Sequence, residues 1–120
     1  MSERRRLELD EIEMTDDAMR ARIAAAHSYT LVLLSAGAHY RSEDARSIIW
    51  EHGRRNMRLA DAGVMPIVCP VRDDTPLCGI AIMATTPERA ADIMDGDPGV
   101  RAGVFAYELH PVSGFPGSIL

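Results

Sequence analysis

The order in which apolar runs alternate with amphipathic segments restricts the fold of this chain more than any other feature. Four short runs rich in strand-forming side chains predict strands near residues 29–36, 65–71, 77–84 and 104–112. Two segments with helical periodicity predict helices near residues 42–62 and 86–95. The order is therefore strand, helix, strand, strand, helix, strand. With right-handed crossovers, it predicts a four-stranded antiparallel sheet with both helices on one face.

Residues at the segment ends support this βαββαβ order, which is that of a ferredoxin-like α+β fold. Ser42 is a candidate N-cap for the first helix, and Gly63 suits the left-handed position after its end. Thr86 followed by Pro87 is typical of a helix start. Pro70 cannot donate a ladder hydrogen bond, so we expect either a hairpin loop longer than two residues or an outer edge strand.

The N-terminal part of the chain has a different charge from the rest. Residues 1–17 hold three Arg and seven acidic residues, a balance of −4, while the remaining 103 residues have a balance of −1. Thr15 can cap a short helix that runs to about His27. We therefore expect an acidic arm with a short helix over residues 1–27 and a single domain over residues 28–120.

Composition excludes several classes of protein. The net charge of −5 argues against a nucleic-acid partner, which needs a basic face. No apolar stretch approaches the length of a membrane helix, and no apolar segment follows the basic residues at 4–6 as in a signal peptide. We therefore expect a cytoplasmic protein. Cys69 and Cys78 are too few for a disulfide scaffold or a zinc site by themselves, which predicts small buried hydrophobes.

The second face of the predicted sheet needs a cover, because both helices lie on the first face. A second copy of the chain would supply this cover, which predicts a two-fold homodimer. The N-terminal arm is a further candidate for part of the cover.

The chain resembles YCII-related proteins in three places. The likeness is carried by Trp50-Glu51-His52 with Leu59, Ala60 and Gly63, by Asp95-Gly96-Asp97-Pro98 with Arg101-Ala102-Gly103-Val104-Phe105, and by His110-Pro111. The resemblance covers about residues 29–111, and the 28 residues before Tyr29 have no counterpart in it. It implies a dimeric ferredoxin-like α+β barrel with a His/Asp active site. A few members of that family eliminate chloride from chlorinated aromatic compounds.

His52 and Asp97 are the candidate catalytic residues. His52 lies on the helix stripe that should face the sheet, and an imidazole can take and return a proton near neutral pH. Asp97 follows the second helix, where a carboxylate could fix the imidazole tautomer. The alternatives are a core histidine satisfied by one hydrogen bond and a turn aspartate bonded to backbone. The resemblance favours the functional interpretation, in which the two side chains lie 2.6–3.2 Å apart, within hydrogen-bond reach.

Three further side chains are candidates for substrate binding. Arg55 shares the His52 helix and could hold an anion, while His39 and Tyr40 lie in a loop where a pocket rim could form. Each also fits an ordinary solvated or loop position. No His or Cys pair has the spacing of metal ligands, so we expect no metal and no other cofactor.

Two functions remain open. The first is a cofactor-free enzyme of lyase or isomerase type, which acts on a small organic molecule with His52 as base and Asp97 as its orienter. The second is a non-enzymatic module for ligand binding or assembly, in which the His/Asp pair is structural. A defined polar pocket of roughly 300 Å³ or more beside His52 would indicate the enzyme, whereas a pair sealed in the core without a pocket would indicate the module.

Overall fold

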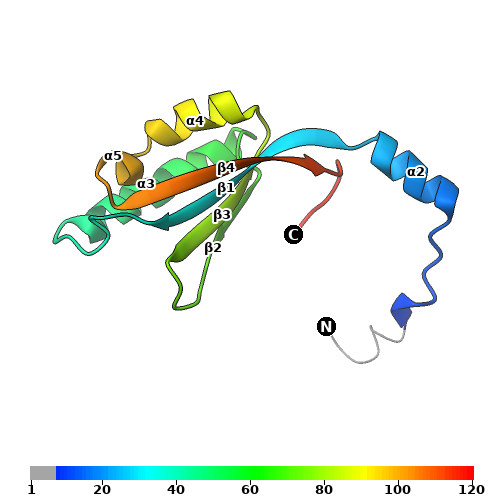
Figure 1. Ribbon diagram of the computed structural model, residues 1–120, viewed down its shortest axis with the longest axis horizontal. Helices are drawn as coiled ribbons and strands as arrows, with labels where there is room; N and C mark the ends of the chain where they lie inside the picture. The colour runs from blue at the N-terminus through cyan, green and yellow to red at the C-terminus, as the bar shows by residue number, and fades with distance from the viewer. Residues whose placement is uncertain (1–7) are drawn as a thin grey trace. The chain divides into compact units, whose positions relative to one another are not determined.

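The computed structural model describes residues 8–120 and has the predicted order of elements, with one extra short helix (Figure 1). The strands are β1 (His27–Ala36), β2 (Ile67–Pro70), β3 (Leu77–Met83) and β4 (Phe105–Gly114). The helices are α2 (Asp16–Ala24), α3 (Ala45–Asp61), α4 (Pro87–Asp95) and the unpredicted α5 (Pro98–Arg101).

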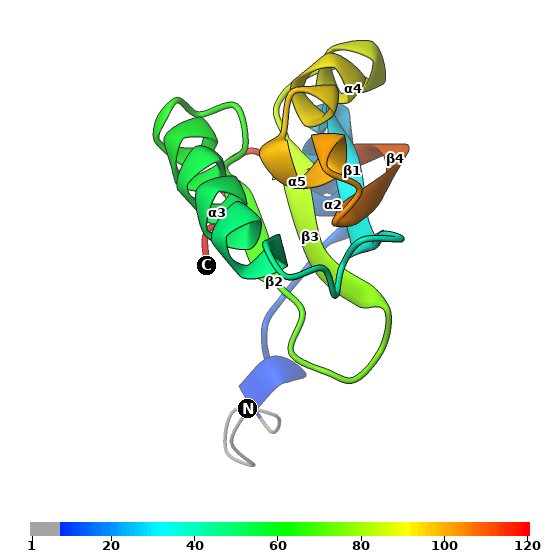
Figure 2. The ribbon, with the colours of Figure 1, turned by 90° about the vertical axis from the view of Figure 1, so that its left-hand side faces the viewer.

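The four strands form one sheet in the order β2-β3-β1-β4, and β3 pairs antiparallel with both of its neighbours. Helices α3 and α4 lie on the same face of this sheet (Figures 1 and 2). This topology confirms the ferredoxin-like α+β fold that the element order predicts.

The core lies between the sheet and the two helices because alternate strand residues point to the same face. On β1, Thr30, Val32 and Leu34 are buried, and the register sets Val32 opposite Ala81 and Thr30 opposite Met83. The Thr30 hydroxyl is buried with a partner, since it donates to the carbonyl of residue 85 at 2.8 Å. Other elements complete the core with Ala45, Met65, Ala90, Met94, Val104 and Phe105.

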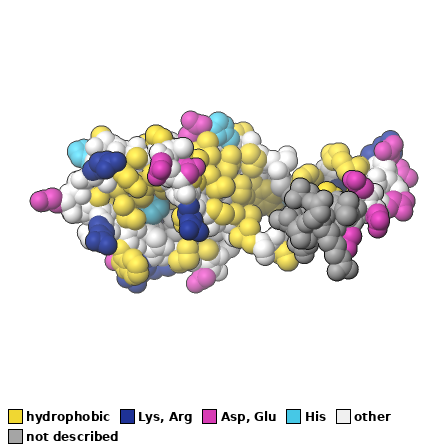
Figure 3. Space-filling view, turned by 90° about the horizontal axis from the view of Figure 1, so that it is seen from below, with side chains coloured by type: hydrophobic (Ala, Val, Ile, Leu, Met, Phe, Trp, Pro, Cys, Tyr) yellow, Lys and Arg dark blue, Asp and Glu magenta, His cyan; other side chains and the backbone are white. Residues whose placement is uncertain are grey.

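The intervening residues of the strands point to the opposite face, which we call the outer sheet face. It carries Leu31, Leu33, Ile67, Cys69, Ile80 and Ile82. These side chains are partly exposed and lie outside the core cluster. Figure 3 shows this side of the molecule, where hydrophobic side chains gather over the sheet. The expectation that Cys69 is buried is therefore wrong, because its position in the register turns it outward.

The predicted start of the first long helix is wrong by three residues. Helix α3 begins at Ala45, and Asp44 is its N-cap residue. The Ser42 hydroxyl donates to the Asp44 carboxylate at 3.0 Å, and residues 39–45 form successive turns, so Ser42 does not cap the helix. At the other end, Gly63 has the predicted left-handed conformation, with φ of 76°.

The remaining boundary predictions are confirmed with small shifts. Thr15 and Thr86 accept hydrogen bonds from the first turns of α2 and α4, respectively. Helix α2 ends at Ala24, before the predicted end at His27, because His27 already starts β1. Pro70 lies exposed at the end of edge strand β2, before a loop of several residues, so it interrupts no central ladder.

The described chain divides into two compact units. One comprises Ser28–Ser113 and holds the sheet, α3, α4 and α5, while the other comprises described residues 8–27 with Gly114–Leu120. No helix within residues 8–120 combines the length and the apolar character needed to cross a membrane.

Candidate functional site

His52 and Asp97 meet inside the domain, as the sequence predicts. His52 lies midway along the inward stripe of α3 and is 8% exposed. Its Nδ1 lies 2.9 Å from Oδ1 and 2.8 Å from Oδ2 of Asp97. The predicted hydrogen-bond distance is confirmed.

Asp97 is held by the backbone as well as by the imidazole. It is the N-cap residue of α5, where its Oδ2 accepts from the amides of Gly99 at 2.9 Å and Val100 at 3.1 Å. Pro98 suits the first position of this short helix because that position needs no amide donor. The same carboxylate therefore makes both the backbone contacts of a turn aspartate and the predicted hydrogen bond to His52. The cap fixes Asp97 in place, and its remaining acceptor capacity faces His52.

The surroundings of Asp97 keep the carboxylate ionised. Burial acts to raise the pKa of Asp97, but the hydrogen bond and charge of His52, the Val100 amide and the Arg55 charge together lower it below the ordinary value. An ionised carboxylate can only accept hydrogen bonds, so Nδ1 of His52 must carry the proton. In the neutral ring, Nε2 then carries the lone pair and is the nitrogen available as a base.

Two neighbours complete the surroundings of the imidazole. The side-chain amide of Asn56, one helical turn further along α3, lies 3.1 Å from Nε2. The Phe105 ring lies against the imidazole with centroids 4.6 Å apart and planes inclined at 49°. The sequence analysis assigned neither residue to the site. The spacing of four between His52 and Asn56 is a signal that could have found the amide.

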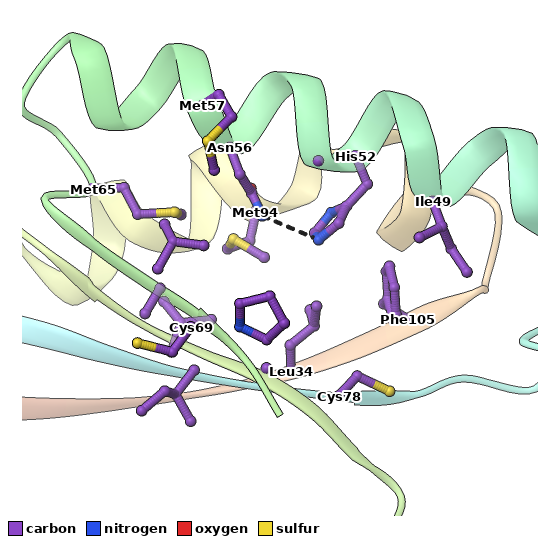
Figure 4. A pocket seen from close by; sticks show the side chains of 17 residues that line it. Leu34, Ile49, His52, Asn56, Met57, Met65, Cys69, Cys78, Met94 and Phe105 are labelled. Atoms are coloured by element: carbon purple, nitrogen blue, oxygen red, sulfur yellow. Dashed lines mark hydrogen bonds between the residues drawn. The ribbon is translucent and has the colours of Figure 1, made fainter. Parts of the chain in front are cut away.

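A cavity of about 260 Å³ lies between α3 and the sheet, next to His52. Figure 4 shows His52 and Asn56 reaching down from α3 toward it, with the hydrogen bond between them drawn. Its walls are mostly apolar, and the lining includes Val32, Leu34, Ile49, Met65, Ala81 and Met94. The pair is thus not sealed in the core, but the cavity is less polar than the sequence analysis required for an enzyme. Among the described lining residues, the only hydrogen-bonding side chains are those of His52, Asn56, Cys69 and Cys78.

Arg55 contacts the dyad from outside the cavity. Its Nη1 lies 3.8 Å from Oδ1 of Asp97, and this buried nitrogen has no hydrogen-bond partner among the described residues. Arg55 is not among the described residues that line the cavity. Its charge therefore acts on the carboxylate, where it helps to lower the pKa of Asp97.

His39 and Tyr40 lie in the loop after β1, outside the described lining of the cavity. The His39 ring packs on Gly103, with Cδ2 only 2.9 Å from where a Cβ would stand. Tyr40 lines an open hollow beside the β2–β3 loop and lies near Phe105, with ring centroids 6.0 Å apart. Cys78 lines the same hollow as Tyr40 and also lines the cavity, and its charge together with burial raises the pKa of Tyr40.

The described residues contain no group of three or more His, Cys, Asp or Glu side chains arranged to hold a metal ion. The carboxylate of Asp97 is already used by two backbone amides and the imidazole. The arrangement is therefore suited to moving a proton between His52 and a molecule in the cavity.

Gly99 gives a test of how Asp97 is positioned. A Cβ at this residue would lie 2.5 Å from Cδ2 of Phe105 and 3.0 Å from Oδ2 of Asp97. We expect Gly99→Ala to lower the free energy of unfolding by about 1–3 kcal/mol, because the ring and the carboxylate must both move. Urea unfolding measures the loss. Gly53→Ala is the matched control, since its Cβ would meet nothing within 4 Å and helix propensity favours alanine by up to about 1 kcal/mol. Equal stability of both variants would contradict this packing.

Comparison with known proteins adds little to this geometry. Neither a protein-family model nor a curated protein matches the chain. Among solved structures, the chain is similar to 5-chloro-2-hydroxyhydroquinone dehydrochlorinase from Burkholderia phenoliruptrix in complex with 2,5-dihydroxybenzoquinone. The two are 14% identical with a TM-score of 0.48, over 68% of this chain and 90% of the other. The fold assignment rests on the strand order of this chain, and membership of the YCII-related family stays a prediction.

Proposed function

We propose that this chain is a cofactor-free acid–base enzyme of lyase or isomerase type, with His52 as base and Asp97 as its orienting carboxylate. The observation that supports this proposal is that the imidazole of His52 lies between a carboxylate and a cavity. Nδ1 meets a buried, backbone-anchored carboxylate, while His52 also lines a cavity of about 260 Å³. That volume is slightly below the range of typical ligand pockets, which suits a small substrate.

The proposed step begins with the neutral imidazole. The Nε2 lone pair takes a proton from a small molecule in the cavity, and the fixed Asp97 carboxylate stabilises the imidazolium that forms. In an isomerisation, the proton returns at another atom of the substrate. In a dehydrochlorination, the electron pair left behind forms a new double bond, and the C–Cl bond breaks with chloride taking the bonding pair. The net loss is HCl, and no oxidant or reductant is needed.

The cavity walls bear on the class of substrate. None of the described lining residues is Arg, so the proposed substrate is a largely apolar molecule with an acidic proton. Of the three substrate-binding candidates, Tyr40 shares a hollow with Cys78, which also lines the cavity. Arg55 would act on the reaction through Asp97, and we assign His39 no contact with the substrate.

The proposed enzymatic activity is tested by measuring whether the protein converts small candidate substrates. We expect the protein to release chloride from a panel of chlorinated hydroquinones, or to exchange deuterium from D₂O into enolisable ketones. Ion chromatography measures the chloride and NMR the deuterium.

Ala81→Leu places three more carbons against this cavity and should lower any turnover at least tenfold, because the substrate site is filled. Ala84→Leu on the same chain segment is the control, since residue 84 is exposed. Full turnover by Ala81→Leu would place the chemistry elsewhere.

The non-enzymatic alternative keeps one observation in its favour. Both ring nitrogens of His52 already have partners within the chain, Asp97 at Nδ1 and Asn56 at Nε2. A structural pair would have the same two contacts. Absence of turnover across the panel, together with tight binding of one of its members, would favour a ligand-binding module.

We also propose that the outer sheet face is covered by a second copy of the chain. The six apolar side chains of this face come from the two central strands and the edge strand β2, so the patch is continuous across three strands. A contiguous apolar surface of this kind is rare on monomeric proteins.

Leu33 and Ile80 lie opposite each other near the middle of that face. We expect light scattering to give a dimer for the natural sequence and a monomer of 13.2 kDa for Leu33→Glu, because a buried, unpaired charge disfavours association. Trp50→Glu removes a large apolar side chain that is 70% exposed on α3, and it should leave the dimer intact. A natural chain that is monomeric at micromolar concentration would refute this interface.

A further inference from the structure

Asn56 is the one carboxamide side chain in a chain without glutamine, and it lies against the proposed base. It is half-buried, lines the cavity and, among the described residues, makes a single side-chain hydrogen bond, with Nε2 of His52 at 3.1 Å. Figure 4 shows the two side chains one turn apart on the cavity side of α3, joined by this bond. The Nε2 lone pair is therefore occupied when the cavity holds nothing else.

The direction of this hydrogen bond follows from the other side of the ring. Because ionised Asp97 accepts the Nδ1 proton, Nε2 of the neutral ring is an acceptor, and the amide nitrogen of Asn56 must donate to it. An imidazole nitrogen has one in-plane lone pair. A substrate proton and the Asn56 amide cannot both lie along it.

We propose that Asn56 is a positioning residue that occupies the lone pair of His52 until a substrate displaces it. The importance of this role for catalysis rests on the proposed function. The amide keeps the ring aligned in the empty site, because its hydrogen bond at Nε2 complements that of Asp97 at Nδ1. Once displaced, the same amide offers a donor and an acceptor to a polar atom next to the transferred proton. The selected substrate therefore carries an oxygen or nitrogen adjacent to its acidic proton.

The test uses the free protein and the electrophilic reagent diethyl pyrocarbonate. The lone pair of an unprotonated imidazole nitrogen attacks this reagent and becomes carbethoxylated. Peptide mapping by mass spectrometry gives the rate at His52 separately from the other three histidines. Asn56→Leu keeps the size of the side chain and removes the amide, so it should raise the rate at His52 about tenfold, as expected for the loss of one net hydrogen bond. Asn56→Asp should lower the rate, because a carboxylate at Nε2 favours the protonated ring.

Met57→Leu is the matched control, because Met57 also lines the cavity but makes no side-chain hydrogen bond to the ring. Its rate at His52 should equal that of the natural sequence. An unchanged rate in Asn56→Leu, or an equal rise in Met57→Leu, would overturn the proposal. Asn56→Ala serves as a second variant if the leucine variant does not fold, and the same rise is expected. Because no substrate is involved, a negative result here leaves the turnover experiments on the proposed enzyme unaffected.

Discussion

Asp97→Ala is expected to lower the free energy of unfolding by about 3–5 kcal/mol, because it leaves several hydrogen-bond donors inside the domain without their acceptor. The carboxylate is 1% exposed and links two helices of the domain, α3 and α5. It accepts from His52 on α3 and from Gly99 and Val100 in α5. Without it, the imidazole and the two amides lose their acceptor, and the nearby Arg55 guanidinium loses the opposite charge beside it.

Urea unfolding measures this loss, and Asp95→Ala is its matched control. Asp95 stands two residues earlier but is exposed, and it accepts from the Tyr107 hydroxyl at 2.6 Å, a bond that helps to raise the pKa of Tyr107 to about 12. We expect a loss of about 1 kcal/mol or less for Asp95→Ala, because one partly exposed hydrogen bond is removed. Equal losses for the two variants would show that Asp97 is an ordinary turn residue.

The same carboxylate makes stability depend on pH in a definite direction. Contacts in the folded state lower the pKa of Asp97 below its ordinary value of 3.8. Its stabilising contribution is therefore complete above about pH 4 and is lost as the pH falls through the lower folded-state pKa. The difference in unfolding free energy between the natural sequence and Asp97→Ala should be constant from pH 7 to about pH 5 and should shrink toward pH 2. A gap that widens in acid would contradict the lowered pKa.

The fold could be predicted from local signals, because each of its parts has a pattern that depends on nearby residues. Apolar strand-forming runs alternate with segments of helical periodicity, and this alternation predicts the order of elements. Thr86-Pro87 and Gly63 mark a helix start and a helix end through their own backbone chemistry. The start of α3 was missed because Ser42 is a good N-cap residue by type, but its hydroxyl donates to Asp44 and the helix begins without a side-chain cap. Helix α5 was missed although Asp97-Pro98 is a helix-start pattern, because four residues give no periodicity.

The site was predictable only in part. The inward stripe of α3 predicts His52, and Asp97 follows from the resemblance together with the position of the second helix on the same face. The roles of Asn56 and Phe105 depend on the orientation of one imidazole, which the pattern of residues does not determine. Arg55, three residues after His52 on α3, reaches toward Gly96 and Asp97 and does not line the cavity, so its charge acts on the carboxylate. The outer position of Cys69 depends on strand register, which a four-residue strand leaves open.

His52→Ala is expected to lower any turnover by a factor of about 10²–10⁴, the usual contribution of a general base. The fold should survive, because alanine is compatible with the helix and Asp97 still accepts hydrogen bonds from the amides of Gly99 and Val100. Removal of the imidazole leaves a buried carboxylate with fewer partners, so we also expect some loss of stability. The loss of turnover should far exceed any fraction of unfolded protein.

His110→Ala is the matched control for this change. His110 is exposed on β4, where it pairs with Glu108, and it does not belong to the described lining of the cavity. It should turn over the same compounds at the natural rate. This separates a requirement for the imidazole of His52 from any general effect of removing a histidine.

The most direct test measures turnover and thermal unfolding on the same samples of the natural sequence, His52→Ala and His110→Ala. A compound from the panel that the natural protein converts is supplied to all three at neutral pH, at a temperature well below each melting transition. We predict that His52→Ala is folded but at least a hundredfold slower, while His110→Ala is unchanged. A folded His52→Ala protein that converts the compound at the natural rate would contradict the central claim, and the His52–Asp97 pair would then be a structural hydrogen bond.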